Sequence, residues 1–358
     1  GEAEAYLVGA YSVLTDTYPL QLLFYAGELM SDNCLGGGGS ADTDCKDINN
    51  FVSSGKVDRF RNAWKHNYKG IFRCNNLIGN FDNVEWGQKE SDIARMKRIK
   101  GEIHFLRAHY YFDLARLFER VPLVLTTEMV NLPQATPDEI YAQIATDLKI
   151  AIENLSDVKY NASDLSNSGR ITKWAAEGMM AKVFLFYTGF YEKDELPLVE
   201  EGESVKKTQV VTWLVDCIEN SGHGLVDDFR RLWPYSYIQD DYQYVKKNNI
   251  GDWVRDGNME SVFAVKYTTT SSGNWDAINR LNNQVCLYYG LRSSGSAGYY
   301  EATYPLGQGW GQGTVNSKLW QDWPDEDLRK RGSILDVYDK DEGIWTLEIL
   351  PQHYTWGA

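Results

Sequence analysis

Three aspartates, Asp42, Asp44 and Asp47, crowd one stretch of the sequence and could supply oxygen ligands to Ca²⁺. A calcium-binding EF-hand loop needs glycine at its sixth position and glutamate at its twelfth. Counted from Asp42, these positions hold Asp47 and Ser53, so an EF-hand is excluded. A looser calcium site made of carboxylates and carbonyls stays open beside the alternative of a solvated acidic loop. No other cofactor is expected.

Aromatic rings are the second chemical feature, because 23 Tyr, 12 Trp and 13 Phe make up 13% of the chain. Tyr and Trp can pack a flat face on a ligand while a polar edge meets water, so their excess suggests a binding surface. Many belong to one Gly-punctuated stretch, residues 274–313, with Trp275, Tyr288, Tyr289, Tyr299, Tyr300, Tyr304 and Trp310. So long a loop usually has a function. For any single ring, a role in core or helix packing is the alternative.

The glycines of Gly307–Gly313 superficially resemble a phosphate-binding loop. The stretch lacks the P-loop lysine and is not followed by a helix start, so a nucleotide site is excluded. Glycines at alternate positions let the backbone turn tightly around Trp310. That ring could face a ligand, or the segment could be a purely structural turn.

Nothing in the sequence supports nucleophilic or zinc-dependent catalysis. There is no GxSxG motif, and His104 and His109 are five residues apart rather than at the spacing of a zinc helix. A pair of carboxylates could still make a glycosidase, but none of the 50 acidic residues is singled out. We therefore expect no catalytic residues.

Charge and cysteine content limit the possible partners. The chain has 36 basic and 50 acidic residues, a net charge of −14 that would repel nucleic acid. No apolar run is long enough to span a membrane as a helix. The five cysteines form no CxxC pair, although Cys34 and Cys45 could bridge within one loop.

The elements that must position these residues are mainly helices in the first two thirds of the chain. Apolar residues recur at three- and four-residue steps through 91–120, and Thr136 to Glu139 form a capping box with Pro137 at the first helical position. Helical patterns also cover residues 3–13, 57–79, 174–187 and 208–218. Short connectors favour antiparallel hairpins of tetratricopeptide type, with an ordinary helical bundle as the alternative because no fixed repeat is visible.

After about residue 222 the composition shifts to Gly, Ser, Asn, Tyr and Trp. The alternation in Glu260–Tyr267 predicts one strand in this part. We therefore predict a mainly α protein with a few short strands. Residues 1–222 would form a tetratricopeptide-like helical scaffold, and residues 223–358 a loop-rich ligand-binding region packed on it.

Several segments, in this order, carry a resemblance to a known family. GEIHFLRAHYYFDL spans 101–114 and leads to VPL at 121–123, TPDEIY spans 136–141, and GRITKWAAEGMMAKVFLFY spans 169–187. Shorter pieces are ESVF at 260–263, GWG at 309–311 and DLRKR at 327–331. Together they resemble the SusD/RagB family of outer-membrane glycan-binding lipoproteins.

The resemblance implies capture of an oligosaccharide or polysaccharide at the cell surface, without catalysis. It also implies a partner, a SusC-like TonB-dependent transporter, and a place on the extracellular face of the outer membrane. No anchoring cysteine precedes Gly1, so a lipid anchor follows from the family alone. Because members continue beyond this region, a further C-terminal segment is expected.

Ligand contacts are expected in the ring-bearing loop, at Trp275, Tyr288, Tyr289, Tyr299, Tyr300 and Trp310. Family members also place contacts after the helix that ends here near Asn80, which adds Trp86. Asn83 and Arg292 are the expected hydrogen-bonding partners. Two other functions stay open: a scaffold subunit of a transporter or fimbrial assembly that binds no glycan, and a glycoside hydrolase.

Overall fold

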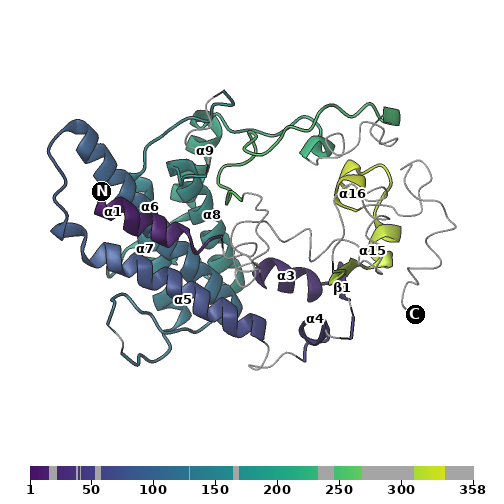
Figure 1. Cartoon of the computed structure of the whole chain (residues 1–358), viewed down its shortest axis with the longest axis horizontal. Coiled ribbons are helices and arrows are strands. Elements are labelled where there is room, and N and C mark those ends of the chain that lie inside the picture. The colour runs from purple at the N-terminus through teal and green to yellow at the C-terminus, as the bar shows by residue number, and fades with distance from the viewer. Residues whose placement is uncertain are drawn as a thin grey trace, which may run out of the picture. The chain divides into compact units, whose positions relative to one another are not determined.

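The computed structural model describes residues 1–15, 22–37, 39–40, 42–52, 58–128, 130–163, 169–232, 246–267 and 310–334 (Figure 1). The chain forms two compact units. The first comprises Gly1–Leu23, Arg59–Gly224 and Met259–Asn282, and the second comprises Phe24–Asp58, Leu225–Asn258 and Asn283–Ala358. The sequence predicts two contiguous domains that meet after residue 222, whereas these units interleave along the chain.

The first unit is built from helices. They are α1 (Glu2–Tyr11), α5 (Asp58–Gly79), α6 (Glu90–Phe118), α7 (Pro137–Asn154), α8 (Lys173–Phe190) and α9 (Lys207–Asn220), with a short 3₁₀ helix, η1 (Phe81–Asn83). Successive helices pack on one another, α6 on α7, α7 on α8 and α8 on α9, and α1 packs on α6 (Figure 1). Two short strands, β2 (Leu196–Pro197) and β3 (Ser204–Val205), form an antiparallel pair between α8 and α9. The predicted mainly α, tetratricopeptide-like fold is confirmed.

Local sequence explains where these helices begin and how closely they approach. The Thr136 hydroxyl accepts a hydrogen bond from the Glu139 backbone N–H at 3.3 Å, and the Glu139 carboxylate accepts one from the Thr136 backbone N–H at 2.8 Å. This capping box satisfies backbone donors at the start of α7. Glycine allows close packing of α6: a Cβ on Gly101 would lie 2.5 Å from Leu155.

The core of the first unit contains a fully paired buried carboxylate. Asp147 of α7 accepts hydrogen bonds from the Arg107 guanidinium of α6 at 2.7 and 2.8 Å, and its other contact is the His104 ring at 2.6 Å. Burial alone would raise the pKa of Asp147, but the charge of Arg107 and these hydrogen bonds lower it below its ordinary value. The network therefore holds an ionised side chain between α6 and α7.

The predicted strand at Glu260–Tyr267 is wrong, because this segment is irregular and has no strand partner among the described residues. Its apolar side chains, Val262, Phe263 and Val265, instead pack against the helical core. The Phe263 ring meets Phe105 of α6 edge to face, 5.5 Å between ring centroids. The segment is thus half-buried against the helical core, and residues 259–282 belong to the first unit.

The second unit contains short elements joined by one long-range strand pair. They are most of α3 (Leu22–Leu29), and β1 (Cys34–Gly36), α4 (Thr43–Asn49), η2 (Phe229–Leu232), β4 (Gly313–Val315), α15 (Ser317–Asp322) and α16 (Leu328–Ser333). Strands β1 and β4 are antiparallel, with Cys34 opposite Val315 and Gly36 opposite Gly313. Because β1 pairs with a strand far along the chain, residues 24–58 join the second unit.

No disulfide joins Cys34 and Cys45, the two described cysteines of this unit. Helix α4 lies against β1 so closely that a Cβ on Gly36 would be 2.5 Å from the carbonyl oxygen of Cys45. Cys34 and Cys45 are both buried, each as a cysteine outside any disulfide. The possible disulfide between them is therefore absent from this structure.

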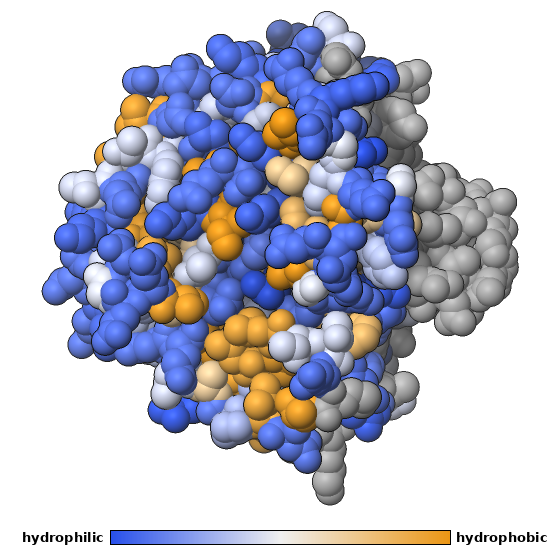
Figure 2. Space-filling model, turned by 90° about the vertical axis from the view of Figure 1, so that its left-hand side faces the viewer, coloured by the Kyte–Doolittle hydropathy of each residue, from blue (hydrophilic) through white to orange (hydrophobic). Residues whose placement is uncertain are grey.

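The visible surface is largely hydrophilic, as expected for a net charge of −14. Figure 2 shows one face on which hydrophilic side chains predominate and hydrophobic ones gather toward the lower part. Among the described residues, no helix combines the length and the apolar character needed to cross a membrane.

Candidate functional site

Trp86 and Asn83 lie together in the connection between α5 and α6. The Trp86 indole packs on the Phe81 ring, with centroids 4.8 Å apart, and its Nε1–H donates to the Phe81 carbonyl at 3.1 Å. This ring is half-buried against the helical core, whereas Asn83 is exposed. The structure thus brings two predicted contacts to one short segment, with the indole held in a fixed orientation.

Trp310 lies at the start of a buried turn that precedes β4. Gly311 has a φ of 61°, a left-handed conformation that suits glycine. A Cβ on Gly37 would lie 2.8 Å from the Gly311 carbonyl oxygen, and buried Gln312 donates to the Asp42 carboxylate at 3.0 Å. These contacts favour a structural role for the glycines. Trp310 itself is half-buried.

Among its described residues, the acidic stretch around Asp42 forms no cluster of metal ligands. The Asp42 carboxylate also accepts from the Gly39 backbone N–H at 2.5 Å, and the Lys46 ammonium donates to the Gly39 carbonyl at 3.2 Å. In the part of the chain that the structure describes, no three His, Cys, Asp or Glu side chains gather to hold a metal. The looser Ca²⁺ site stays a prediction.

The other predicted contacts fall outside the described residues. They are Trp275, Tyr288, Tyr289, Arg292, Tyr299 and Tyr300.

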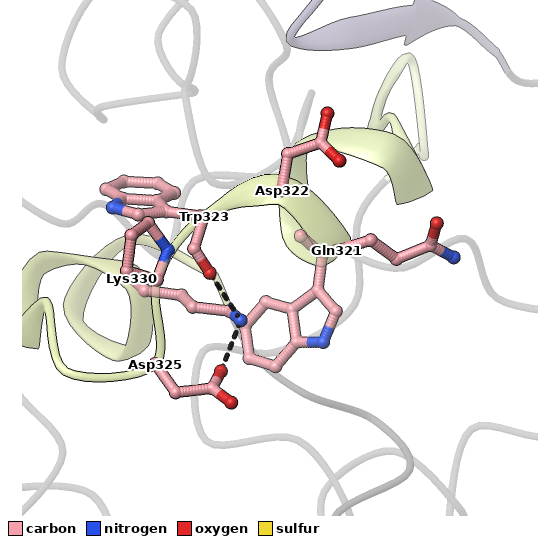
Figure 3. A pocket seen from close by; sticks show the side chains of 7 residues that line it. Gln321, Asp322, Trp323, Asp325 and Lys330 are labelled. Atoms are coloured by element: carbon pink, nitrogen blue, oxygen red, sulfur yellow. Dashed lines mark hydrogen bonds and ion pairs between the residues drawn. The ribbon is translucent and has the colours of Figure 1, made fainter.

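The sequence did not point to a hollow of about 400 Å³ beside α15 and α16 in the second unit (Figure 3). Its lining consists of Trp320, Gln321, Asp322, Trp323, Pro324, Asp325 and Lys330. We call it the α15–α16 hollow. It combines two indole rings with an amide and two carboxylates, the side-chain types that bind a flat, hydroxyl-rich ligand.

Local hydrogen bonds fix the two short helices that carry this lining. Asn316 caps α15, accepting from the Lys318 backbone N–H at 3.0 Å. Asp327 caps α16 in the same way through the Arg329 backbone N–H, also at 3.0 Å, and accepts from Trp323 Nε1 at 3.0 Å. Hydrogen bonds from the Arg329 side chain, and next that from Trp323, hold the pKa of Asp327 far below its usual value. The indole of Trp323 is thereby tied to the start of α16.

Lys330 forms the base of the hollow. Its ammonium donates to the Asp325 carboxylate at 2.5 Å and to the Trp323 carbonyl at 2.9 Å, as Figure 3 shows. It also lies 4.3 Å from the centroid of the Trp320 ring. Lys330 is buried although it is charged, which these three contacts explain.

Trp320 and Trp323 were not predicted from the sequence, although a short motif that follows them could have drawn attention to this segment. The DLRKR piece at 327–331 contributes to the family resemblance, and it contains the cap Asp327 and the buried Lys330. Both residues hold the tryptophans in place through the contacts described above. The DLRKR motif thus contains residues that hold the two tryptophans in place, but not the tryptophans themselves.

Comparisons with known proteins agree on one family. Residues 6–185 match the model of the SusD-like family whose description reads "Starch-binding associating with outer membrane". A SusD-like protein of Bacteroides ovatus is 27% identical over 231 residues, covering 63% of this chain and 36% of that protein. SusD-like protein P2 of Formosa agariphila is 22% identical over 297 residues, covering 81% of this chain and 48% of that protein. The chain thus spans less than half the length of these two relatives.

Solved structures share the fold. A laminarin-binding SusD-like protein superposes with a TM-score of 0.72 at 25% identity, over 96% of this chain and 67% of that chain. Surface glycan-binding protein A from Bacteroides fluxus gives a TM-score of 0.71 at 23% identity, over 94% of this chain and 64% of that chain.

Proposed function

Because the chain belongs to the SusD-like family, we propose that it binds an oligosaccharide or polysaccharide at the cell surface and delivers it to an outer-membrane transporter. The transporter would be a SusC-like TonB-dependent protein. The chain would act on the extracellular face of the outer membrane, held there by an N-terminal lipid anchor. Binding needs no catalytic step and no cofactor.

The observation that carries this proposal is the α15–α16 hollow. Indole faces can stack on the apolar faces of sugar rings, and the Gln321 amide and the Asp322 carboxylate can orient hydroxyl groups. Both indoles are held by contacts to Lys330 and Asp327, so little side-chain freedom would be lost on binding. A hollow in which two held indoles lie beside an amide and two carboxylates supports binding of a sugar.

The residues expected from the sequence stay further proposed contacts, each within its own unit. Trp86 in the first unit and Trp310 in the second offer partly exposed aromatic surface, and Asn83 is exposed near Trp86. Trp275, Tyr288, Tyr289, Arg292, Tyr299 and Tyr300 complete the proposed set of contacts. We propose a β-glucan as the first ligand to test, because one of the structurally similar proteins, 25% identical to this chain, is described as a laminarin-binding SusD-like protein.

A binding screen tests this function. The whole chain is run against a panel of plant, algal and host polysaccharides, products are analysed for every hit, and each hit is repeated with a chelator. Binding without cleavage, unchanged by the chelator, supports the proposal. Binding of no polysaccharide favours the scaffold alternative, and released sugar favours a glycoside hydrolase.

A further inference from the structure

The basic side chains around the α15–α16 hollow are already paired with acids of the same segment. Lys318 pairs with Asp322, one turn along α15. The Arg329 guanidinium lies 2.6 Å from the Asp327 carboxylate, and Lys330 lies 2.5 Å from Asp325. Each cation of residues 317–330 therefore has a carboxylate partner.

Lys330 is the cation that lines the hollow, and its donors are occupied. An ammonium has three N–H donors. Two serve Asp325 and the Trp323 carbonyl, and the third side of the group faces the Trp320 ring. Only 4% of Lys330 is exposed, so turning toward a ligand would break these contacts. Among the described residues that line it, the hollow thus lacks an available cation for an anionic ligand group.

Of the charged residues that line the hollow, the two acids are accessible and Lys330 is buried. The side chains of Asp322 and Asp325 are 61% and 89% exposed. Residues 317–330 hold four acids (Asp322, Asp325, Glu326 and Asp327) and three bases (Lys318, Arg329 and Lys330), so their net charge is −1, and that of the chain is −14. Ionised carboxylates accept hydrogen bonds from hydroxyl groups but repel other carboxylates and sulfates.

We propose that the α15–α16 hollow selects neutral glycans and excludes those that carry uronic acids or sulfate esters. This inference rests on the proposed function and specifies the ligand class of the same site. Neutral hexose units offer hydroxyl donors to Asp322 and an apolar face to the indoles. A uronate would bring its carboxylate beside Asp322 or Asp325, where Lys318 is already paired with Asp322 and Lys330 is held by its own contacts.

The test compares one neutral and one acidic polysaccharide, laminarin and polygalacturonate, by calorimetric titration of the whole chain at low ionic strength. Charge reversal at the hollow, Asp322→Lys, should strengthen polygalacturonate binding relative to laminarin by about tenfold or more, and about 0.5 M NaCl should remove most of this gain. Asp256→Lys is the matched control, because Asp256 is exposed in the second unit and does not line the hollow.

The possible outcomes distinguish failure of the proposed selectivity from failure of the proposed function. Preference of the wild type for laminarin, with a shift caused by Asp322→Lys alone, supports the selectivity. Equal binding of both polysaccharides by the wild type overturns the selectivity and leaves glycan binding in place. Equal effects of the two substitutions overturn the assignment to the hollow. Binding of neither polysaccharide, nor of any other in the panel, overturns the function itself.

Discussion

The ammonium of Lys330 lies over the indole of Trp320, 4.3 Å from the ring centroid. The same group is hydrogen-bonded to Asp325 and to the Trp323 carbonyl, so one buried lysine connects three residues of the hollow. A cation held against an indole away from water contributes about 2 kcal/mol. Lys330 therefore acts as the fixed base on which the ring of Trp320 is oriented.

Lys330→Met should lower the free energy of unfolding by about 1–3 kcal/mol, because the methionine keeps the apolar stem but leaves the Trp323 carbonyl without its donor. Urea unfolding followed by tryptophan fluorescence measures the loss. Lys318→Met is the control: that pair is exposed, with 74% of the lysine side chain accessible, and its removal should cost about 0.5 kcal/mol or less. Equal losses in the two variants would show that Lys330 is not a structural base.

Asp147→Asn should strongly destabilise the helical unit. It leaves the buried guanidinium of Arg107 without its ion partner, which costs about 3–5 kcal/mol. Asp157→Asn, at an exposed position in the same unit, should change stability by less than about 0.5 kcal/mol. Urea unfolding followed by circular dichroism compares the two variants. A denaturation midpoint for Asp147→Asn close to that of Asp157→Asn would contradict the account of the α6–α7 core.

Stability should fall as pH rises toward neutrality because of Glu177 on α8. Burial raises the pKa of Glu177 from 4.5 to about 7, although Lys173 lies 3.6 Å away. Between these values the folded chain keeps a proton that the unfolded chain releases. The contribution of Glu177 is thus fully present below pH 4.5 and is lost as pH rises through about 7.

Glu177→Gln should remove this component, whose slope is at most about 1.4 kcal/mol per pH unit. Asp216 and Cys217 of α9 are the other ionisable groups that act on Glu177 or respond to it, and both stay in the variant. Urea unfolding across this pH range measures the slope for wild type, Glu177→Gln and the exposed control Glu219→Gln. An unchanged slope in Glu177→Gln, or an equal change in Glu219→Gln, would count against the buried acid.

Binding should depend on the rings expected from the sequence. Trp310→Ala and Trp275→Ala should each weaken glycan affinity by about fivefold or more, as expected for an aromatic contact within a binding site, and leave the helical circular dichroism unchanged. Phe190→Ala is the control, because that ring is 67% exposed on α8 and belongs to no proposed contact. Unaltered affinity in both tryptophan variants would remove these residues from the site.

Local signals predicted the helical part of the fold well. The capping box at Thr136 and Glu139 placed the start of α7, and the apolar stripe through 91–120 anticipated α6 at Glu90–Phe118. These features depend on residues close in sequence. The alternating pattern wrongly predicted a strand at Glu260–Tyr267. Alternation suggests which side chains could face a core, but it does not show whether a partner strand is available, and none is present among the described residues.

Long-range features were beyond the sequence. The pairing of β1 with β4 depends on register between distant segments, which no local pattern specifies. The α15–α16 hollow was not predicted for a similar reason. Nothing in the sequence distinguishes Trp320 and Trp323 from other aromatic residues, because the contacts of Lys330 and Asp327 that orient them are visible only in the structure. The sequence left two roles open for the Gly-rich segment at Trp310, a ligand-binding loop or a structural turn. The contacts that this segment makes to Gly37 and Asp42 favour a structural role for its glycines.

The central claim is that this chain holds a glycan without cleaving it. The most direct measurement is a calorimetric titration of the whole chain with laminarin, or with the tightest ligand of the panel, followed by a reducing-end assay on the same sample. We predict saturable binding with no increase in reducing ends. The affinity should be lower in Trp320→Ala and in Gln321→Ala, which changes an exposed residue. Growth of reducing ends with time, or affinity that both substitutions leave unchanged, would contradict the account.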